Sequence, residues 1–110
     1  MHNPPAWLDQ AARQRWAELV GLREWRPAEL DQLATYCTNF SRWQAAEEWL
    51  ADPKPDEYGN PTRGPVAHIL DDKGNVKSIV PSPQIAISAN AAREMTRISK
   101  LLRLNARPRG

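Results

Sequence analysis

Hydrophobic residues recur at every third or fourth position over the first part of the chain. The apolar stripe that they form predicts an amphipathic helix beginning after Asp9, which is in a favourable N-cap position. Gly21 is expected to end or weaken this helix. The members of the stripe are Leu8, Ala12, Trp16, Leu19 and Val20.

A second helix is predicted over residues 28–51, with Pro27 at the favoured first position and Glu29 and Asp31 close to the helix start. At about 1.5 Å per residue it would be about 36 Å long. Its large residues follow a three-four rhythm, which favours packing along another helix. We therefore expect the first two elements to form an antiparallel helical hairpin. The large residues are Leu33, Tyr36, Phe40, Trp43 and Leu50.

A β-hairpin is predicted in the middle of the chain. Residues 52–64 are rich in proline and glycine and should form a loop. Two short strand-like runs follow, residues 66–70 and 76–80, and Gly74 can take the left-handed position in the turn between them. We assign Ile69 and Ile79 to one face and Val66 and Leu70 to the other. Because an isolated two-stranded hairpin is marginal in water, it should need cover from its own helices or from another subunit.

A third, strongly amphipathic helix is predicted after the hairpin, with Ser82 as its cap and Pro83 at its first position. One arc of this helix is apolar and comprises Ile87, Ala91, Met95, Ile98 and Leu102. Opposite the arc lie Arg93, Arg97 and Lys100, with Arg103 at its margin and a basic end beyond.

These patterns predict a mainly α fold. Residues 1–52 would form the helical hairpin, residues 53–81 the loop and β-hairpin, and residues 82–110 the C-terminal helix with a basic tail. A chain of 110 residues fits a single compact domain, and its thin core makes oligomerisation one way to bury more surface. The five tryptophans add to this expectation, because each can bury roughly 150–250 Å².

The net charge of +2 is unevenly distributed, with +5 on residues 93–110 and −3 on the rest. Such asymmetry suggests a tail that faces a polyanion or an acidic partner. The candidates for contact with DNA or a protein partner are Arg93, Arg97, Lys100, Arg103, Arg107 and Arg109. The alternative is a solvated face whose cations complement the helix dipole.

Weaker candidates for DNA contact lie in and after the first helix: Arg13, Arg15, Arg23 and Arg26. The stems of Arg13 and Arg15 are equally suited to covering the edges of the core. Among the aromatic residues, Tyr36 and Trp43 fall on the seam of the second helix, where core or subunit-interface packing is favoured over base stacking. Trp49 lies off the seam and is the best candidate for an intersubunit contact.

Residues suited to catalysis are few. The two histidines, His2 and His68, are far apart, and Cys37 has apolar neighbours that favour a buried, inert thiol. Asp71 and Asp72 are better explained by a hairpin loop than by a metal site. We therefore expect no enzyme, no cofactor and no metal site. Without a membrane-spanning run or a secretory start, a cytosolic location is expected.

The order of these elements resembles the small-subunit family of tailed-phage terminases, over roughly residues 5–109. The similarity begins with Pro5-Ala6-Trp7-Leu8, Trp16 and Asp31. It is most specific within the second helix, in Leu33-Ala34-Thr35-Tyr36-Cys37, Phe40-Ser41-Arg42-Trp43 and Ala45-Ala46-Glu47. It continues with Pro83 to Ile87 and with Met95, Arg97 and Leu101. One departure is clear: relatives typically close the last helix with Leu-Gly-Leu-Thr-Pro, whereas this chain has Leu102-Arg103-Leu104-Asn105-Ala106.

The resemblance implies a non-enzymatic subunit of a homo-oligomeric ring, of roughly eight to ten copies. Such a ring would recognise double-stranded viral DNA and would recruit and regulate the large terminase subunit, an ATPase and nuclease, for genome packaging. It would act in the host cytoplasm, away from membranes and outside the mature virion. The alternatives are a small helical DNA-binding regulator and an adaptor protein without a role in packaging.

Overall fold

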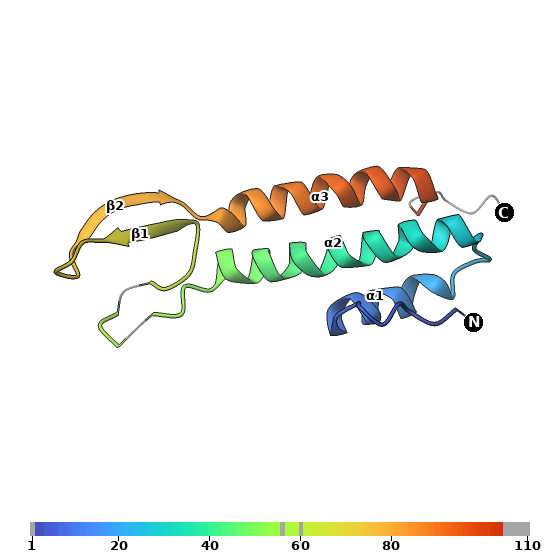
Figure 1. The fold of residues 1–110 in the computed structure, drawn as a ribbon, viewed down its shortest axis with the longest axis horizontal. Helices are drawn as coiled ribbons and strands as arrows, with labels where there is room; N and C mark the ends of the chain where they lie inside the picture. Colours follow the sequence, from blue (N-terminus) through green and yellow to red (C-terminus); the bar gives the residue numbers. More distant parts are fainter. Residues whose placement is uncertain (1, 56, 60, 105–110) are drawn as a thin grey trace.

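The structure is a computed structural model that describes residues 2–55, 57–59 and 61–104. These residues form the helices α1 (Gln10–Val20), α2 (Pro27–Ala51) and α3 (Pro83–Leu102) and the strands β1 (Val66–Leu70) and β2 (Val76–Pro81). The long α2 is central, with α1 along one side and α3 along the other, and each neighbour runs antiparallel to it (Figure 1). The predictions of a mainly helical chain and of an antiparallel α1–α2 hairpin are confirmed.

The first helix begins at the predicted cap. The carboxylate of Asp9 accepts a hydrogen bond from the backbone N–H of Ala12 at 2.9 Å and another from the hydroxyl of Ser41 in α2 at 2.6 Å. Gly21 is the C-cap, in the right-handed rather than the left-handed conformation. The indole N–H of Trp16 donates to the carbonyl of His2 at 3.1 Å, so the segment before α1 is attached to the helix.

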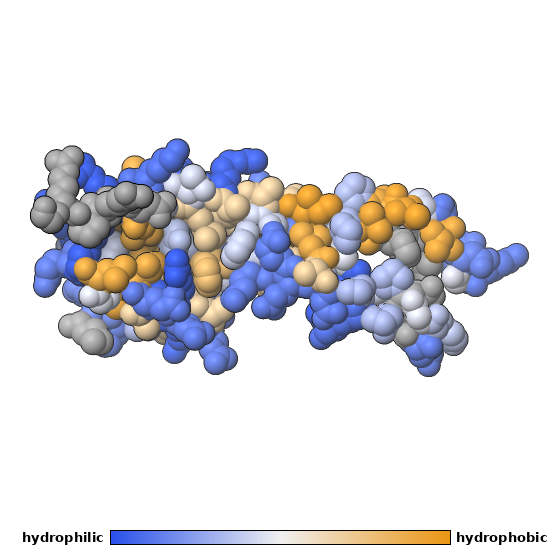
Figure 2. Space-filling model, turned by 180° about the vertical axis from the view of Figure 1, so that it is seen from behind, coloured by the Kyte–Doolittle hydropathy of each residue, from blue (hydrophilic) through white to orange (hydrophobic). Residues whose placement is uncertain are grey.

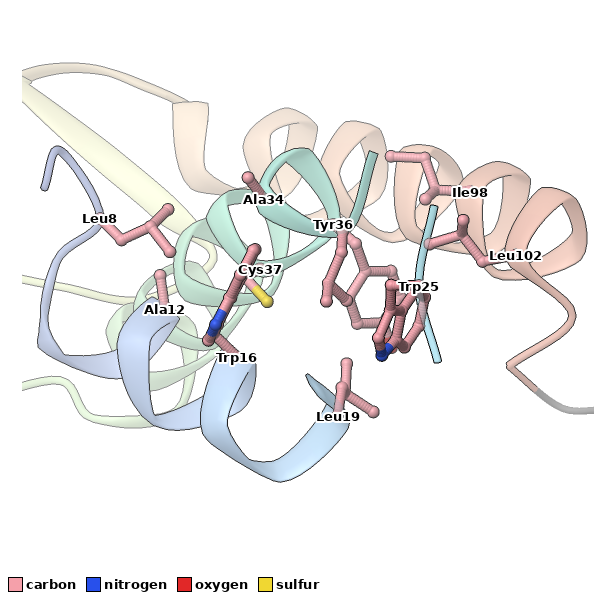
Figure 3. Close-up of a cluster of buried hydrophobic side chains, with 11 residues drawn as sticks. Leu8, Ala12, Trp16, Leu19, Trp25, Ala34, Tyr36, Cys37, Ile98 and Leu102 are labelled. Atoms are coloured by element: carbon pink, nitrogen blue, oxygen red, sulfur yellow. The ribbon is translucent and has the colours of Figure 1, made fainter. Parts of the chain in front are cut away.

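The core lies at one end of the molecule, where all three helices meet (Figure 3). Trp16 from α1, Trp25 from the α1–α2 connection and Tyr36 from α2 are its large aromatic members. From the predicted arc of α3, Ala91, Ile98 and Leu102 are buried and Met95 is partly buried against the core. Ile87 is 44% exposed, so the arc is shorter than expected.

The other half of the α2–α3 pair has a thin seam of small and polar residues. Its buried members are Asn39, Ala46, Ser88 and Ala91, and the hydroxyl of Ser88 donates to the carboxylate of Glu47. Because α1 does not reach this half, the molecule is elongated (Figure 1). It measures 62 × 24 × 23 Å and has a radius of gyration of 18.5 Å, against about 13 Å for a compact domain of this length. The molecule is therefore an elongated body.

The β-hairpin projects beyond the helices (Figure 1). Its register places Val66 opposite Pro81 and His68 opposite Ile79, so Val66 and Ile79 share a face. Our assignment of these two residues to opposite faces is wrong. The reason is a bulge between Ile69 and Leu70, which shifts the register by one residue and exchanges the faces.

The described part of the chain leaves much of the hairpin uncovered. Val66 is 46% exposed, Val76 is 53% exposed and Ile79 is 60% exposed. Ile85 and Ile87, just beyond the hairpin in α3, are also exposed. Figure 2 shows hydrophobic side chains on one face of this end of the molecule, over the hairpin and the start of α3. The predicted need for cover is therefore not met by the chain's own helices.

Both ends of α3 differ in detail from expectation. Ser82 is at the N-cap, but its hydroxyl donates to the side chain of Gln84 instead of capping the helix. At the other end Arg103 has a φ of +54°. The N–H of Arg103 bonds to the carbonyl of Lys100 and the N–H of Leu104 bonds to that of Ser99, the pattern of a Schellman motif.

Candidate nucleic-acid interface

The cations of α3 face solvent because the apolar arc on the opposite side of the helix is buried against α2. Arg93, Arg97 and Lys100 are all exposed. Their spacing of four and three residues aligns them over about 10 Å of helix axis. This spacing of the cations along the helix is suited to contact with successive phosphates of a nucleic-acid strand or with a row of acidic side chains.

One of these cations is already paired. The guanidinium of Arg97 donates two hydrogen bonds to Glu94 Oε2, at 2.8 and 3.2 Å. The hydrogen bond and the charge of Arg97 lower the pKa of Glu94, and the same contact raises the pKa of Arg97. Within the described part of the chain, neither Arg93 nor Lys100 forms an ion pair. These two cations therefore keep their full charge available for a partner.

Arg103 is exposed at the end of α3, beyond Lys100. Its position continues the cationic face toward the C-terminal residues. Arg107 and Arg109, the remaining members of the predicted basic end, lie outside the described residues.

Three of the four weaker candidates have structural contacts. The guanidinium of Arg13 donates to the carbonyls of Leu8 and Ala6, both at 2.9 Å, and so fixes the segment before α1. Arg15 forms an ion pair with Glu18 at 2.7 Å and lies over the ring of Phe40 at 4.9 Å.

At the α1–α2 corner, Arg23 forms an ion pair with Glu29 at 3.1 Å and lies over the ring of Trp25 at 4.2 Å. Arg26 is exposed at the N-cap of α2, and its backbone N–H donates to Glu29 at 2.9 Å. The contacts of Arg13 and Arg15 are consistent with the alternative in which their stems cover core edges, and Arg23 also has structural contacts.

The predicted aromatic interface residues have three different environments. Tyr36 is buried within the chain's own core. Trp43 is half-buried, with its ring centroid 6.1 Å from that of Phe40. Trp49 is half-buried, and the guanidinium of Arg63 from the following loop lies 5.0 Å from its ring centroid. One face of Trp49 is thus already covered by its own chain.

A groove between α2 and α3 was missed by sequence reasoning. It has a volume of about 490 Å³ and is lined by Asn39, Arg42, Ile87, Asn90, Ala91 and Glu94. Because its two walls are nearly fifty residues apart in sequence, only the antiparallel pairing brings them together. The available signal was Arg42 itself, a cation within the stretch Phe40-Ser41-Arg42-Trp43.

A second groove lies along the same pair of helices. Its lining combines the aromatic side chains of Tyr36 and Trp43 with Met95 and Lys100. Like the first groove, it has a single cation in its described lining, here beside two aromatic rings.

Cys37 and Asp71, two of the residues considered for catalysis or metal binding, have ordinary structural environments. Burial raises the pKa of the Cys37 thiol to about 12, which keeps it protonated at neutral pH. Asp71 Oδ1 accepts the backbone N–H groups of Lys73 and Asn75, each at 2.9 Å, in the hairpin turn where Gly74 has a φ of +82°. Within the described residues, no cluster of three or more potential metal ligands is found. None of the helices in that same part of the chain is long and apolar enough to cross a membrane.

Comparison with known protein families, with characterised proteins and with solved structures gave no match for this chain.

Proposed function

We propose that this chain is the small subunit of a phage terminase, a non-enzymatic protein that binds viral DNA and recruits the large, ATPase-nuclease subunit for packaging. The observation that carries the proposal is the outward row of cations on α3, in which Arg93 and Lys100 are exposed and free of ion pairs within the described residues. The resemblance of residues 5–109 to that family supplies the biological context.

The packing of α3 supports a binding role for this row. The helix uses one side to complete the core through Ile98 and Leu102 and presents its cations on the other. Removing these cations should therefore change binding without changing the fold. In an oligomer each cation is repeated in every subunit, so weak phosphate contacts add up to a useful affinity.

The projecting hairpin supports assembly. It exposes Val66, Val76 and Ile79 and has only two strands, a combination that is marginal without additional cover. We propose that neighbouring subunits of a ring provide this cover. The ring and its contact with the large subunit rest on the resemblance, and the uncovered hairpin is the structural feature consistent with them.

Salt-dependent DNA binding tests the proposal. The full chain should bind double-stranded DNA with an affinity that falls steeply as salt rises. Joint replacement of Arg93, Arg97 and Lys100 by alanine should weaken binding and reduce the slope of log K against log salt by about 2 to 3. The control replaces two exposed lysines that lie outside the strands, Lys54 and Lys73, and should reduce neither the affinity nor the slope. Equal losses in both variants, or no binding at low salt, would overturn the DNA-binding role.

The oligomeric state separates packaging from the two alternatives. Native mass measurement of the full chain, with and without DNA, should show a closed oligomer of many copies. A monomer or a simple dimer would favour the small DNA-binding regulator. A protein that binds an acidic partner but no DNA would favour the adaptor.

A further inference from the structure

We infer that the groove between α2 and α3, lined by Asn39, Arg42, Asn90 and Glu94, holds a segment of DNA backbone, with Arg42 bound to a phosphate. The inference rests on the proposed DNA-binding function and names a contact site that lies beside the cationic row. It concerns Arg42 of α2, which is not among the residues that the sequence suggested as contacts with DNA.

The charge of Arg42 is uncompensated. It is exposed, and the residues three and four positions away in α2 are Thr38, Asn39, Ala45 and Ala46, none of which is acidic. Among the described residues that line the groove, the single carboxylate is Glu94, and that group is bound to Arg97. Arg42 has no ion-pair partner among the described residues, and a cation in this state beside an open groove is suited to an anionic ligand.

The opposite wall supplies a second cation. Because Glu94 lines the groove and Arg97 Nη2 lies 2.8 Å from its carboxylate, the guanidinium of Arg97 is adjacent to the rim. Arg42 from α2 and Arg97 from α3 thus stand on different helices beside one groove. Such a pair can contact a phosphodiester chain from two sides, whereas cations on one face of a single helix can contact it from one side only.

The carboxamides add neutral hydrogen-bonding groups between these cations. The amide of Asn39 donates to the carbonyl of Thr35 at 2.9 Å, which fixes this side chain at the floor of the groove. Asn90 is exposed on the α3 wall and can donate to a phosphate or sugar oxygen. Ile87 and Ala91 provide the apolar part of the lining, which suits the sugar portion of the backbone.

The experiment compares three variants by the salt dependence of double-stranded DNA binding. Arg42→Ala should weaken binding and reduce the slope of log K against log salt by about 0.9, the value for one phosphate contact. Asn90→Ala should weaken binding while leaving the slope unchanged, because it removes a neutral donor. Lys73→Ala, which removes an exposed cation from the hairpin turn, outside the strand face proposed for assembly, is the matched control and should change neither quantity.

A second pair of variants tests the groove without removing a cation. Ile87→Glu places a negative charge in the groove and should lower DNA affinity at least tenfold at low salt, whereas Leu22→Glu, at a position 68% exposed outside the groove, should not. Circular dichroism of each variant establishes that the helices are retained.

The possible negative results distinguish failure of the groove inference from failure of the proposed function. If the wild type binds DNA and the α3 triple variant does not, but Arg42→Ala behaves like Lys73→Ala, the groove inference falls and the proposed function stands. If Arg42→Ala changes the mass of the oligomer and leaves the salt slope intact, the groove holds a second copy of the chain and the inference is wrong. If the wild type binds no DNA at low salt, the proposed function fails first.

Discussion

Arg103 occupies a backbone conformation that favours glycine, with φ at +54° and ψ at +41°. This conformation is sterically unfavourable for arginine, because a Cβ atom in the left-handed region lies close to the following carbonyl group. Glycine, which has no Cβ atom, would adopt the same conformation without this steric cost. The Schellman hydrogen bonds of Arg103 and Leu104, together with the packing of Leu104 against the core, hold the residue in this conformation.

Replacing Arg103 by glycine should therefore stabilise the protein by about 0.5 to 1 kcal/mol. Urea unfolding monitored by circular dichroism measures the change. The control is Ala89→Gly, at an exposed position in the interior of the same helix, which should destabilise by about 1 kcal/mol because glycine is a poorer helix former than alanine. Destabilisation by both replacements would contradict the strain at Arg103.

Asp9 is a second residue whose role can be tested on its own. Its carboxylate caps α1 by accepting a hydrogen bond from the N–H of Ala12 and accepts another from the hydroxyl of Ser41 in α2. Both hydrogen bonds lower the pKa of Asp9 below its ordinary value of 3.8, and that from Ser41 has the larger effect. Asp9→Ala should cost about 1 kcal/mol at neutral pH through the lost cap.

The effect of Asp9→Ala should depend on pH. Folding lowers the pKa of Asp9, so as the pH falls the carboxylate is protonated in the unfolded chain before it is protonated in the folded one. The stabilisation by the charged carboxylate is present above pH 3.8 and is lost as the pH falls through the pKa of the folded state. Unfolding curves of the wild type and the variant should therefore converge below pH 3.8. A difference between the two proteins that stays constant down to pH 2.5 would show that the charge of Asp9 contributes nothing.

At the scale of elements, the hairpin should act in assembly and not in the folding of the helices. Joint replacement of Val66 and Ile79 by threonine keeps β-branched side chains in the strands but makes their shared face polar. We expect a smaller oligomer by native mass measurement and an unchanged helical signal. The control is Leu22→Thr, an exposed apolar residue at the α1–α2 corner. Loss of helix in the double variant would show that the hairpin supports the helices directly.

The elements themselves followed from local signals in the sequence. The cap at Asp9, Pro27 and Pro83 at the first positions of α2 and α3, and Gly74 in the hairpin turn were all predicted, because each depends on a few neighbouring residues. The assignment of residues to the two faces of the hairpin was not predicted correctly, because one bulged residue reverses the faces. The αL conformation of Arg103 also escaped prediction, since arginine carries no signal for it.

The candidate site was predicted only where a single helix defines it. The outward position of Arg93, Arg97 and Lys100 follows from the periodicity of α3. The structural roles of Arg13 and Arg23 depend on the lead-in segment and on the corner around Trp25, which periodicity does not describe. The groove around Arg42 depends on which turn of α2 lies beside which turn of α3. That alignment is a tertiary property.

At the scale of the whole molecule, stability is unevenly distributed along α2 and α3. The half near Leu33 and Ile98 contacts α1 and contains the large buried side chains, whereas the half near Ala46 and Ser88 has a seam of small residues and carries the hairpin. Local opening should require less free energy where fewer apolar contacts are broken. The elongated shape therefore predicts a gradient of stability from the core end to the hairpin end.

Hydrogen exchange measured by mass spectrometry tests this gradient. In dilute protein, amides of residues 33–37 and 98–102 should exchange most slowly, and those of residues 46–51 and 83–88 at least tenfold faster, because the latter lack the cover of α1. Raising the protein concentration should slow exchange in residues 66–70 and 76–81 more than in the core, since these strands expose the apolar residues that another copy would cover. Equal rates of amide exchange along the whole of α2 in dilute protein would contradict the predicted gradient of stability. A concentration effect confined to α1 would place the subunit contact at the opposite end of the molecule from the hairpin.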